Sequence, residues 1–231
     1  MRPTRHFSTV VLLTLLSCGP TLAQQQGFKF NQPDEADRQE QLDKQAKDDR
    51  IRAQLSTPCK AAIKDRKIMV LIGERQSNGV IAAEQQNYGA HFNAINNRLR
   101  VLGLKTYTPE EIRRQIAQAE VDAYLKNDQE AMLSAAKRLG ASFVLRGLIS
   151  SQATKNPMMN VNQVAVNMQF TLSGNGKIIS ETEAHSASYA GADVGRMALT
   201  LVNEQADEVV ATLYEDYCRK TVAPAKKPAP K

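Results

Sequence analysis

Glu181, Glu183 and His185 are the side chains of this chain whose types and spacing come closest to a catalytic group. Residues two apart share one face of a strand, so the two carboxylates would lie side by side, and one of them could act as a general acid if its pKa were raised. The sequence shows no apolar surrounding that would raise a pKa, which favours a solvated strand face. An enzyme would require these three side chains to converge in a cleft.

The patterns of the common catalytic and metal sites are absent from the sequence. Beyond residue 23 the chain has two histidines, His91 and His185, with no acids at metal-ligand spacing and no Gly-x-Ser-x-Gly elbow. His91 precedes Phe92 in a helical pattern, which predicts a partly exposed packing residue. Residues 174–177 (Gly-Asn-Gly-Lys) lack the earlier glycine of a phosphate loop and predict a hairpin turn. We therefore expect no enzyme activity, no cofactor and no metal.

One loop carries a weaker signal for ligand binding. Gly73–Gly79 follows an apolar run that is typical of a buried strand, and loops at the carboxyl ends of such strands often bind ligands. The loop has no Gly-x-Gly-x-x-Gly pattern, so it predicts no nucleotide site.

Residues 1–23 have the pattern of a secretion signal. Two arginines precede the apolar run Val10–Leu16, which is too short to span a bilayer. Gly19-Pro20 then breaks any helix, and the small residue Ala23 suits a signal peptidase. The pattern favours cleavage before Gln24 and places the mature chain in the periplasm.

A second interpretation of the same segment is a lipoprotein signal. Leu15-Leu16-Ser17-Cys18 resembles a bacterial lipobox, in which Cys18 becomes the lipidated first residue. Because the residue after Cys18 is Gly19 and not an Asp, the lipoprotein would then be directed to the outer membrane, where it would face the periplasm. Lipidation would be its membrane anchor, because no other stretch is long and apolar enough to span.

Export also determines how the remaining cysteines are interpreted. Cys59 and Cys218 form an even pair in an oxidising compartment, and they border the segment that carries the apolar patterns. Without Cys-x-x-Cys spacing, a structural disulfide is favoured over a reactive thiol pair.

Charge and composition divide the chain into parts. Of the net charge of +6, the signal contributes two arginines and residues 219–231 contribute five cations, which leaves about −1 for residues 24–218. A nearly neutral core excludes the basic surface of a nucleic-acid binder. Residues 24–58 form a polar leader, helical from Asp34 and solvated, because no heptad seam is sustained. Residues 219–231 are rich in Pro, Ala and Lys and predict a disordered tail.

The segment 59–218 predicts a single α/β domain. Ile68–Ile72 is an unbroken apolar run, as in a strand buried on both faces, and Thr108-Pro109-Glu110-Glu111 is a capping box. Val164–Leu172 alternates apolar and polar residues, and Gly140 is expected to end a helix before the strand Phe143–Ile149. The expected order is β-α-β-α-α-β-β-β-α, with one mixed sheet covered by helices.

This order and three motifs resemble the Tol amino-terminal-domain-like superfamily of exported bacterial proteins. That superfamily includes the curli secretion lipoprotein, the lipoprotein activator of penicillin-binding proteins and the middle domain of the flagellar T-ring protein. Leu139–Gly147 is similar to the family's Leu-Gly-Ala-Asp-Tyr-Val-Leu-x-Gly block, with Ser142 in place of the usual Asp. Leu104–Glu110 is similar to its second strand, and Gly174–Lys177 is similar to its hairpin turn.

The resemblance covers residues 67–217 and implies a fold more strongly than a function. It implies a non-enzymatic envelope protein that binds a protein partner or takes part in an assembly, including a homo-oligomer. The alternative is a component of an oligomeric outer-membrane secretion channel related to the curli secretion lipoprotein. The polar segment Ser151–Gln163 disfavours that alternative.

The two interpretations of the signal predict different mature proteins. We expect the intact mass of the exported protein to match a chain that begins at Gln24. A mass that includes acyl groups on a chain beginning at Cys18 would contradict this and support the lipobox.

Overall fold

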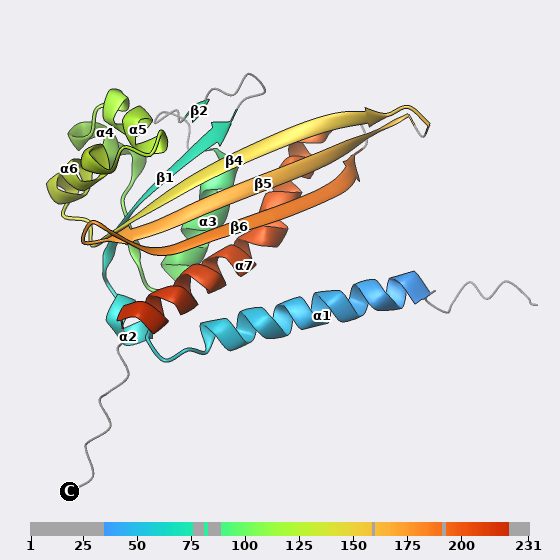
Figure 1. The fold of residues 1–231 in the computed structure, drawn as a ribbon, viewed down its shortest axis with the longest axis horizontal. Coiled ribbons are helices and arrows are strands. Elements are labelled where there is room, and N and C mark those ends of the chain that lie inside the picture. The colour runs from blue at the N-terminus through green and yellow to red at the C-terminus, as the bar shows by residue number, and fades with distance from the viewer. Residues whose placement is uncertain (1–34, 76–80, 83–88, 159, 191–192, 222–231) are drawn as a thin grey trace, which may run out of the picture. The chain divides into compact units, whose positions relative to one another are not determined.

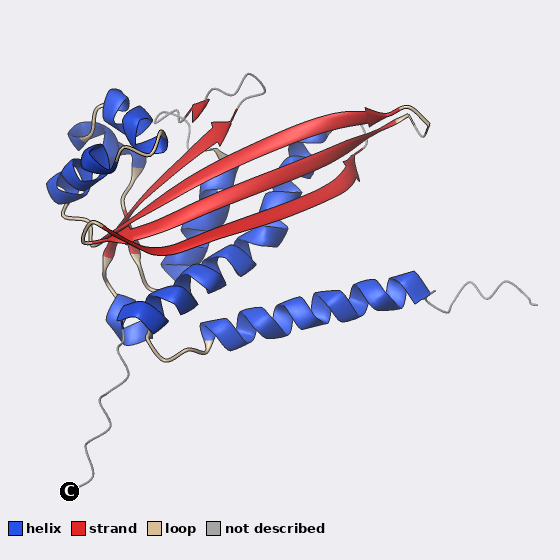
Figure 2. Ribbon diagram, viewed as in Figure 1, coloured by secondary structure: helices blue, strands red, loops and turns tan. Residues whose placement is uncertain are grey.

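The computed structural model describes residues 35–75, 81–82, 89–158, 160–190 and 193–221, and Figures 1 and 2 show the arrangement of its elements. Residues 1–40 and 41–231 form two units, and the core belongs to the second. The elements are α1 (Glu35–Leu55), α2 (Lys60–Ile63), β1 (Lys67–Arg75), β2 (Ile81–Ala82), α3 (Ala90–Val101), β3 (Lys105–Thr106), α4 (Pro109–Gln115), α5 (Gln118–Leu125), α6 (Gln129–Leu139), β4 (Phe143–Asn156), β5 (Val161–Gly174), β6 (Lys177–Ala190) and α7 (Val194–Thr221).

The described strands form one mixed sheet in the order β2-β1-β4-β5-β6, with β3 paired to β1. β1 runs parallel to β3 and β4, whereas β4–β5 and β5–β6 are antiparallel hairpins. The expected α/β class with a single mixed sheet is therefore confirmed.

Helices cover the two faces of the sheet unequally. On the inner face, α3 and α7 pack over β1, β4, β5 and β6, and the apolar residues of β5 point into this core. On the outer face, α4–α6 enclose a smaller core with Met69, Leu71, Val144 and Leu148. In Figure 1 this group of helices lies at one end of the sheet, and none of the described helices lies in front of the far ends of β4 and β5, near their connecting hairpin.

A close approach between β4 and β5 requires a glycine. Gly147 is paired with Phe170, and a Cβ at Gly147 would lie 2.5 Å from Cε1 of the Phe170 ring and 3.2 Å from Cγ1 of Ile72. The space above Gly147 is therefore filled by side chains of the inner core.

Several local predictions are confirmed. The Thr108 hydroxyl accepts from the Glu111 N–H at 3.2 Å, and the Glu111 carboxylate accepts from the Thr108 N–H at 2.7 Å, which completes the capping box. Gly140 ends α6 with a left-handed φ of 65°. Asn175 and Gly176, both with positive φ, make the turn between β5 and β6, so residues 174–177 are a hairpin turn.

The expected order of elements is wrong in two respects, and one strand is longer than expected. The single helix expected after Thr108 breaks at Ile116, which adopts an extended conformation with its side chain buried, so α4 and α5 are separate. The structure adds the short elements α2 and β2. β4 continues seven residues past Ile149, because its polar end pairs with β5 along the whole hairpin.

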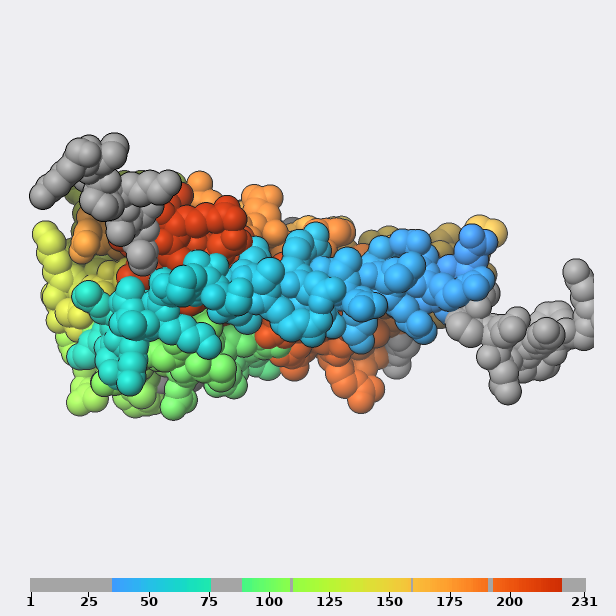
Figure 3. Space-filling view, turned by 90° about the horizontal axis from the view of Figure 1, so that it is seen from below, coloured from blue at the N-terminus to red at the C-terminus, as the bar shows by residue number. Residues whose placement is uncertain are grey.

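The leader and the tail differ in extent from the expectation. α1 is helical and none of its residues is buried, but residues 41–58 belong to the same compact unit as the core. Lys47 Nζ lies 3.3 Å from the Glu208 carboxylate of α7 and 2.9 Å from the Gln205 side-chain oxygen, and Figure 3 shows the part of α1 after residue 40 in front of α7. α7 continues to Thr221, into the segment expected to be tail, and residues 222–231 lie outside the described residues, as do residues 1–34 with Cys18.

We expect Gly147→Ala to lower the free energy of unfolding by about 1–3 kcal/mol, because the added methyl group overlaps the Phe170 ring. The measurement is chemical denaturation. Gly140→Ala is the matched control, since its Cβ would meet no atom within 4 Å and its cost, about 1 kcal/mol, comes only from positive φ. A Gly147→Ala variant as stable as the wild type would contradict the packing of the Phe170 ring over β4.

Candidate functional site

The candidate site is the part of the outer sheet face beyond the reach of α4–α6. The strand register sets four rows of side chains across β4, β5 and β6 here. We call these rows the open sheet face: Leu148–Gln169–Glu183, Ser150–Asn167–His185, Gln152–Ala165–Ala187 and Thr154–Gln163–Tyr189. Most of these side chains are exposed, although Leu148 is buried and Ser150 and Ala165 are half-buried.

A hollow of about 370 Å³ lies over the first two rows. It is lined by residues of both rows and by Arg75, the last residue of β1. Its volume is within the range of small-molecule sites. The segment Gly73–Gly79 was expected to be a loop, but its first three residues belong to β1, and residues 76–79 lie outside the described residues.

Hydrogen bonds fix the polar side chains of the hollow. Gln169 Nε2 donates to Glu183 Oε1 at 3.0 Å, and His185 Nδ1 lies 2.6 Å from Asn167 Oδ1. Each bond joins neighbouring strands, so these amides are held in defined orientations.

The acid–base hypothesis for Glu181, Glu183 and His185 finds no support in this arrangement. All three side chains are exposed, and only Glu183 and His185 line the hollow. Glu183 and His185 are bonded to amides across the strands rather than to each other. The described residues also hold no group of three or more His, Cys, Asp or Glu that could bind a metal ion.

The sequence indicated Glu183 and His185 of the hollow, but it did not indicate the amides of the hollow or Tyr189 at the far end of the open sheet face. The signal for the amides was present, because the polar positions of the alternating strand Val164–Leu172 must face away from the core. Tyr189 lies beyond that alternation and could be placed only by the register of β5 with β6.

A second feature next to the open sheet face is the outer edge of β6. This strand is 14 residues long and ends the sheet, and no described strand pairs with its outer side. A bulge opposite Leu172 and Ser173 interrupts its first residues, and Glu181 and Glu183 follow. From Ala184 to Ala190 the strand has no Pro, Gly, Lys, Arg, Asp or Glu, so it lacks the usual features that prevent edge pairing.

The structure pairs His91 with an acid that the sequence did not indicate. Its Nδ1 lies 2.6 Å from Glu74 Oε1 at the end of β1, and this hydrogen bond, together with the charge of a protonated imidazole, lowers the pKa of the Glu74 carboxyl. Glu74 and His91 are 17 residues apart, so no local spacing connects them. Among the described residues no nucleophile is bonded to His91, so the pair has no described partner for catalysis.

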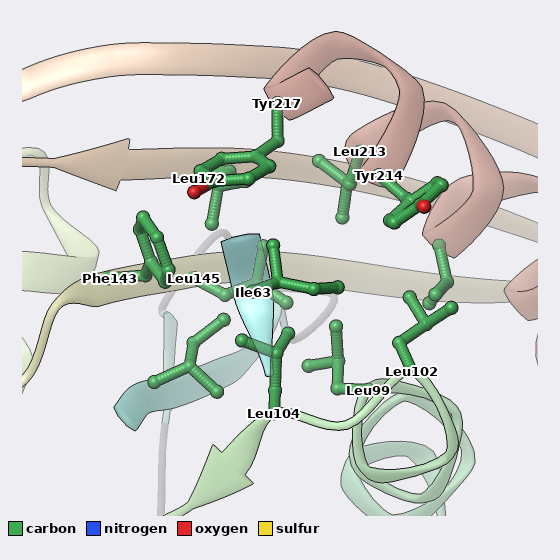
Figure 4. Close-up of a pocket in the computed structure, with 12 residues that line it drawn as sticks. Ile63, Leu99, Leu102, Leu104, Phe143, Leu145, Leu172, Leu213, Tyr214 and Tyr217 are labelled. Atoms are coloured by element: carbon green, nitrogen blue, oxygen red, sulfur yellow. The ribbon is translucent and has the colours of Figure 1, made fainter. Parts of the chain in front are cut away.

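Two smaller cavities, one in the inner core and one near the surface, are poor ligand sites. Figure 4 shows one of about 30 Å³ between the inner sheet face, α3 and α7, where apolar side chains such as Leu99, Leu145 and Leu213 point into the same space. The other, about 20 Å³, is lined by Tyr124, whose hydroxyl is buried without a partner among the described residues, and by Arg146, which donates to the Leu125 carbonyl. Burial raises the pKa of Tyr124, and the nearby Arg146 charge opposes that shift. Both volumes are close to that of one water molecule.

The structure brings Cys59 and Cys218 together as the sequence suggested. Their sulfur atoms are at bonding distance and their Cα atoms are 5.7 Å apart, which is within the range for a disulfide. Tyr214 supports the same junction, because its hydroxyl donates to the Thr57 carbonyl at 2.5 Å and accepts from the Cys59 N–H at 3.3 Å. The segment before β1 is thus fixed to the end of α7.

The helices that the structure describes include none with the length and apolarity to cross a membrane. Neither a known family model nor a curated protein matches the chain.

Several solved structures are similar in part. The PelC dodecamer from Paraburkholderia phytofirmans is 15% identical, with 65% of this chain and 88% of that chain covered and a TM-score of 0.37. Lipoprotein GNA1162 from Neisseria meningitidis is 14% identical, with 63% and 98% covered and a TM-score of 0.42. The LpoB C-terminal domain from Salmonella enterica is 17% identical, with 59% and 91% covered and a TM-score of 0.36. At these scores the likeness assigns neither a family nor a function.

Oxidation of the cysteine pair in the exported protein is a prediction. A disulfide that closes a loop of 159 residues stabilises by about 5 kcal/mol in the chain-entropy model, so we expect a Cys59→Ala, Cys218→Ala variant to lose about 2–5 kcal/mol in chemical denaturation. Reductant should destabilise the wild type and leave the variant unchanged. Titration of two free thiols in the unfolded, unreduced mature protein would contradict the disulfide.

Proposed function

We propose that this chain is an exported, non-enzymatic protein of the bacterial cell envelope that works by binding, as a docking or assembly module for a protein partner. The family resemblance found in the sequence implies this class of envelope protein. The structural observation that supports the proposal is the outer edge of β6, with which no described strand pairs. An unpaired strand offers a row of backbone N–H and C=O groups, to which an extended segment of another protein can add as a further strand.

The more exposed part of this strand is Ala184–Tyr189, where exposed and half-buried residues alternate, whereas Ala190 is buried. Nearer the turn, Ser180 donates to Asp216 of α7 at 2.6 Å, so α7 lies against the first part of the strand. The inward residues of the second part are small, Ala184, Ser186 and Ser188, and they are half-buried towards α7. A partner strand added here would continue the sheet without meeting a charged side chain of β6 beyond Glu183.

The proposed function also specifies where the protein acts and what it binds. We propose the periplasm, with an outer-membrane lipoprotein facing the periplasm as the alternative if Cys18 is processed. The partner is an envelope protein or a second copy of this chain, and nucleic acid is excluded by the nearly neutral core.

The alternative of an outer-membrane secretion channel has less support. Residues 151–155, in the far half of the β4–β5 hairpin, are almost all polar and all exposed. A membrane-inserted hairpin would need apolar residues on the side that meets lipid.

Proline substitution tests the edge. In an antiparallel edge strand, neighbouring residues direct their N–H groups alternately to the paired strand and to the free side. Of Ala187→Pro and Ser188→Pro, one therefore breaks the ladder with β5, whereas the other blocks only the outer edge. Thermal unfolding identifies the variant that blocks only the outer edge, because that variant keeps the unfolding midpoint of the wild type.

We expect the stable proline variant of the full mature chain to lose an envelope protein that the wild type captures from envelope extract, or to lose a wild-type homo-oligomer in native mass spectrometry. Val101→Ala, on the exposed side of α3, is the control and should bind as the wild type does. If the stable proline variant keeps all partners of the wild type, β6 is not the docking edge.

A further inference from the structure

The open sheet face differs chemically from the edge beside it. Most of its side chains are amides, hydroxyls or methyl groups, and Glu183 is the one acid in its four rows. Arg75 adds one guanidinium at the rim of the hollow. The face is therefore close to neutral, which disfavours a strongly charged ligand.

This composition also disfavours a protein or nucleic-acid surface as the ligand of the face. Protein interfaces are enriched in aromatic residues, Met and Arg at their centre, and this face has Tyr189 alone among the aromatic residues in its rows. Nucleic-acid surfaces need several Lys or Arg residues to contact phosphates. Neither class of macromolecule matches the residues present.

The hydrogen-bonding groups of the face are held in place and only partly used. The Gln169–Glu183 bond leaves the Gln169 side-chain oxygen and the second Glu183 oxygen as acceptors for a ligand. The His185–Asn167 bond leaves the amide hydrogens of Asn167 and the Nε2 atom of His185 for a ligand. Donors and acceptors thus alternate over a short distance. A ligand hydroxyl both donates and accepts, so a polyhydroxylated ligand can satisfy both kinds of group.

The far rows supply an apolar contact beside these polar groups. Tyr189 is 53% exposed and lies on the same side of the sheet as His185, four residues and about 13 Å further along β6. Between them, Ala165 and Ala187 face each other across the strands and keep the surface low. In a chain of sugars, one ring with an exposed apolar face can pack against the tyrosine, while the hydroxyls of other rings reach the amides of the hollow.

We propose that the open sheet face binds a neutral glycan chain, with its hydroxyl groups bonded to Asn167, Gln169, Glu183 and His185 and a sugar ring packed on Tyr189. The inference rests on the proposed function, because it assigns a ligand to a protein that works by binding. It concerns the face of the sheet, whereas the protein partner is assigned to the edge of β6. The extended row from the hollow to Tyr189 suits a chain better than a single sugar.

Titration of the full mature chain with four neutral or charged oligosaccharides tests the assignment. We use chitotetraose, cellotetraose and maltotetraose as neutral probes and tetragalacturonate as the anionic one, followed by NMR or calorimetry up to about 10 mM. At least one neutral probe should bind, and tetragalacturonate should bind more weakly. Tyr189→Ala and Asn167→Ala should each weaken binding about tenfold, because each removes one ring contact or one hydrogen-bonding group.

Val101→Ala on α3 is the matched control, as an exposed apolar truncation away from this face, and should leave affinity unchanged. The proposal is overturned if no neutral probe binds at this concentration, or if both face variants bind as tightly as the wild type. If no sugar binds but the face variants lose the captured envelope protein, the face docks protein and the proposed function stands. If no sugar binds and the stable proline variant also keeps every partner, both proposals fail.

Discussion

The packing of β4 is the constraint on which the other elements depend. This strand pairs with β1 on one side and β5 on the other, and it contributes to both cores, with Leu145 and Ile149 inward and Val144 and Leu148 outward. At Gly147 the Phe170 ring occupies the space of a side chain, which allows the inner core to close over the strand. β4 thus joins the parallel part of the sheet to the two hairpin strands.

The reach of the helices explains why part of the outer sheet face is left open. α3 and α7 cover the inner face, and the long helix α7 buries a continuous apolar stripe against β5 and β6. The outer helices α4, α5 and α6 are short and reach only as far as Leu148. Beyond that point most outward residues of the strands are polar, so the uncovered surface is compatible with water and available for binding.

The sequence predicted most of the fold where a periodic pattern or a capping motif carries the information. The alternation Val164–Leu172, the capping box at Thr108 and the helix end at Gly140 are as expected. The break at Ile116 was missed because a buried isoleucine also fits a helical stripe. The extension of β4 past Ile149 was missed because both faces of its end are exposed, which leaves no alternation. The Glu74–His91 pair and the rows of the open sheet face depend on tertiary contacts and strand register, which no local spacing encodes.

The central claim is that the uncovered part of the sheet, its face and its β6 edge, is the functional surface. Amide hydrogen exchange of the full mature chain, with and without its captured partner or bound oligosaccharide, tests this most directly. The account predicts that added protection is concentrated in β5 and β6, chiefly residues 161–171 and 181–190. Protection that appears instead on α3 or along the outward side of α7, with β6 unchanged, would contradict it.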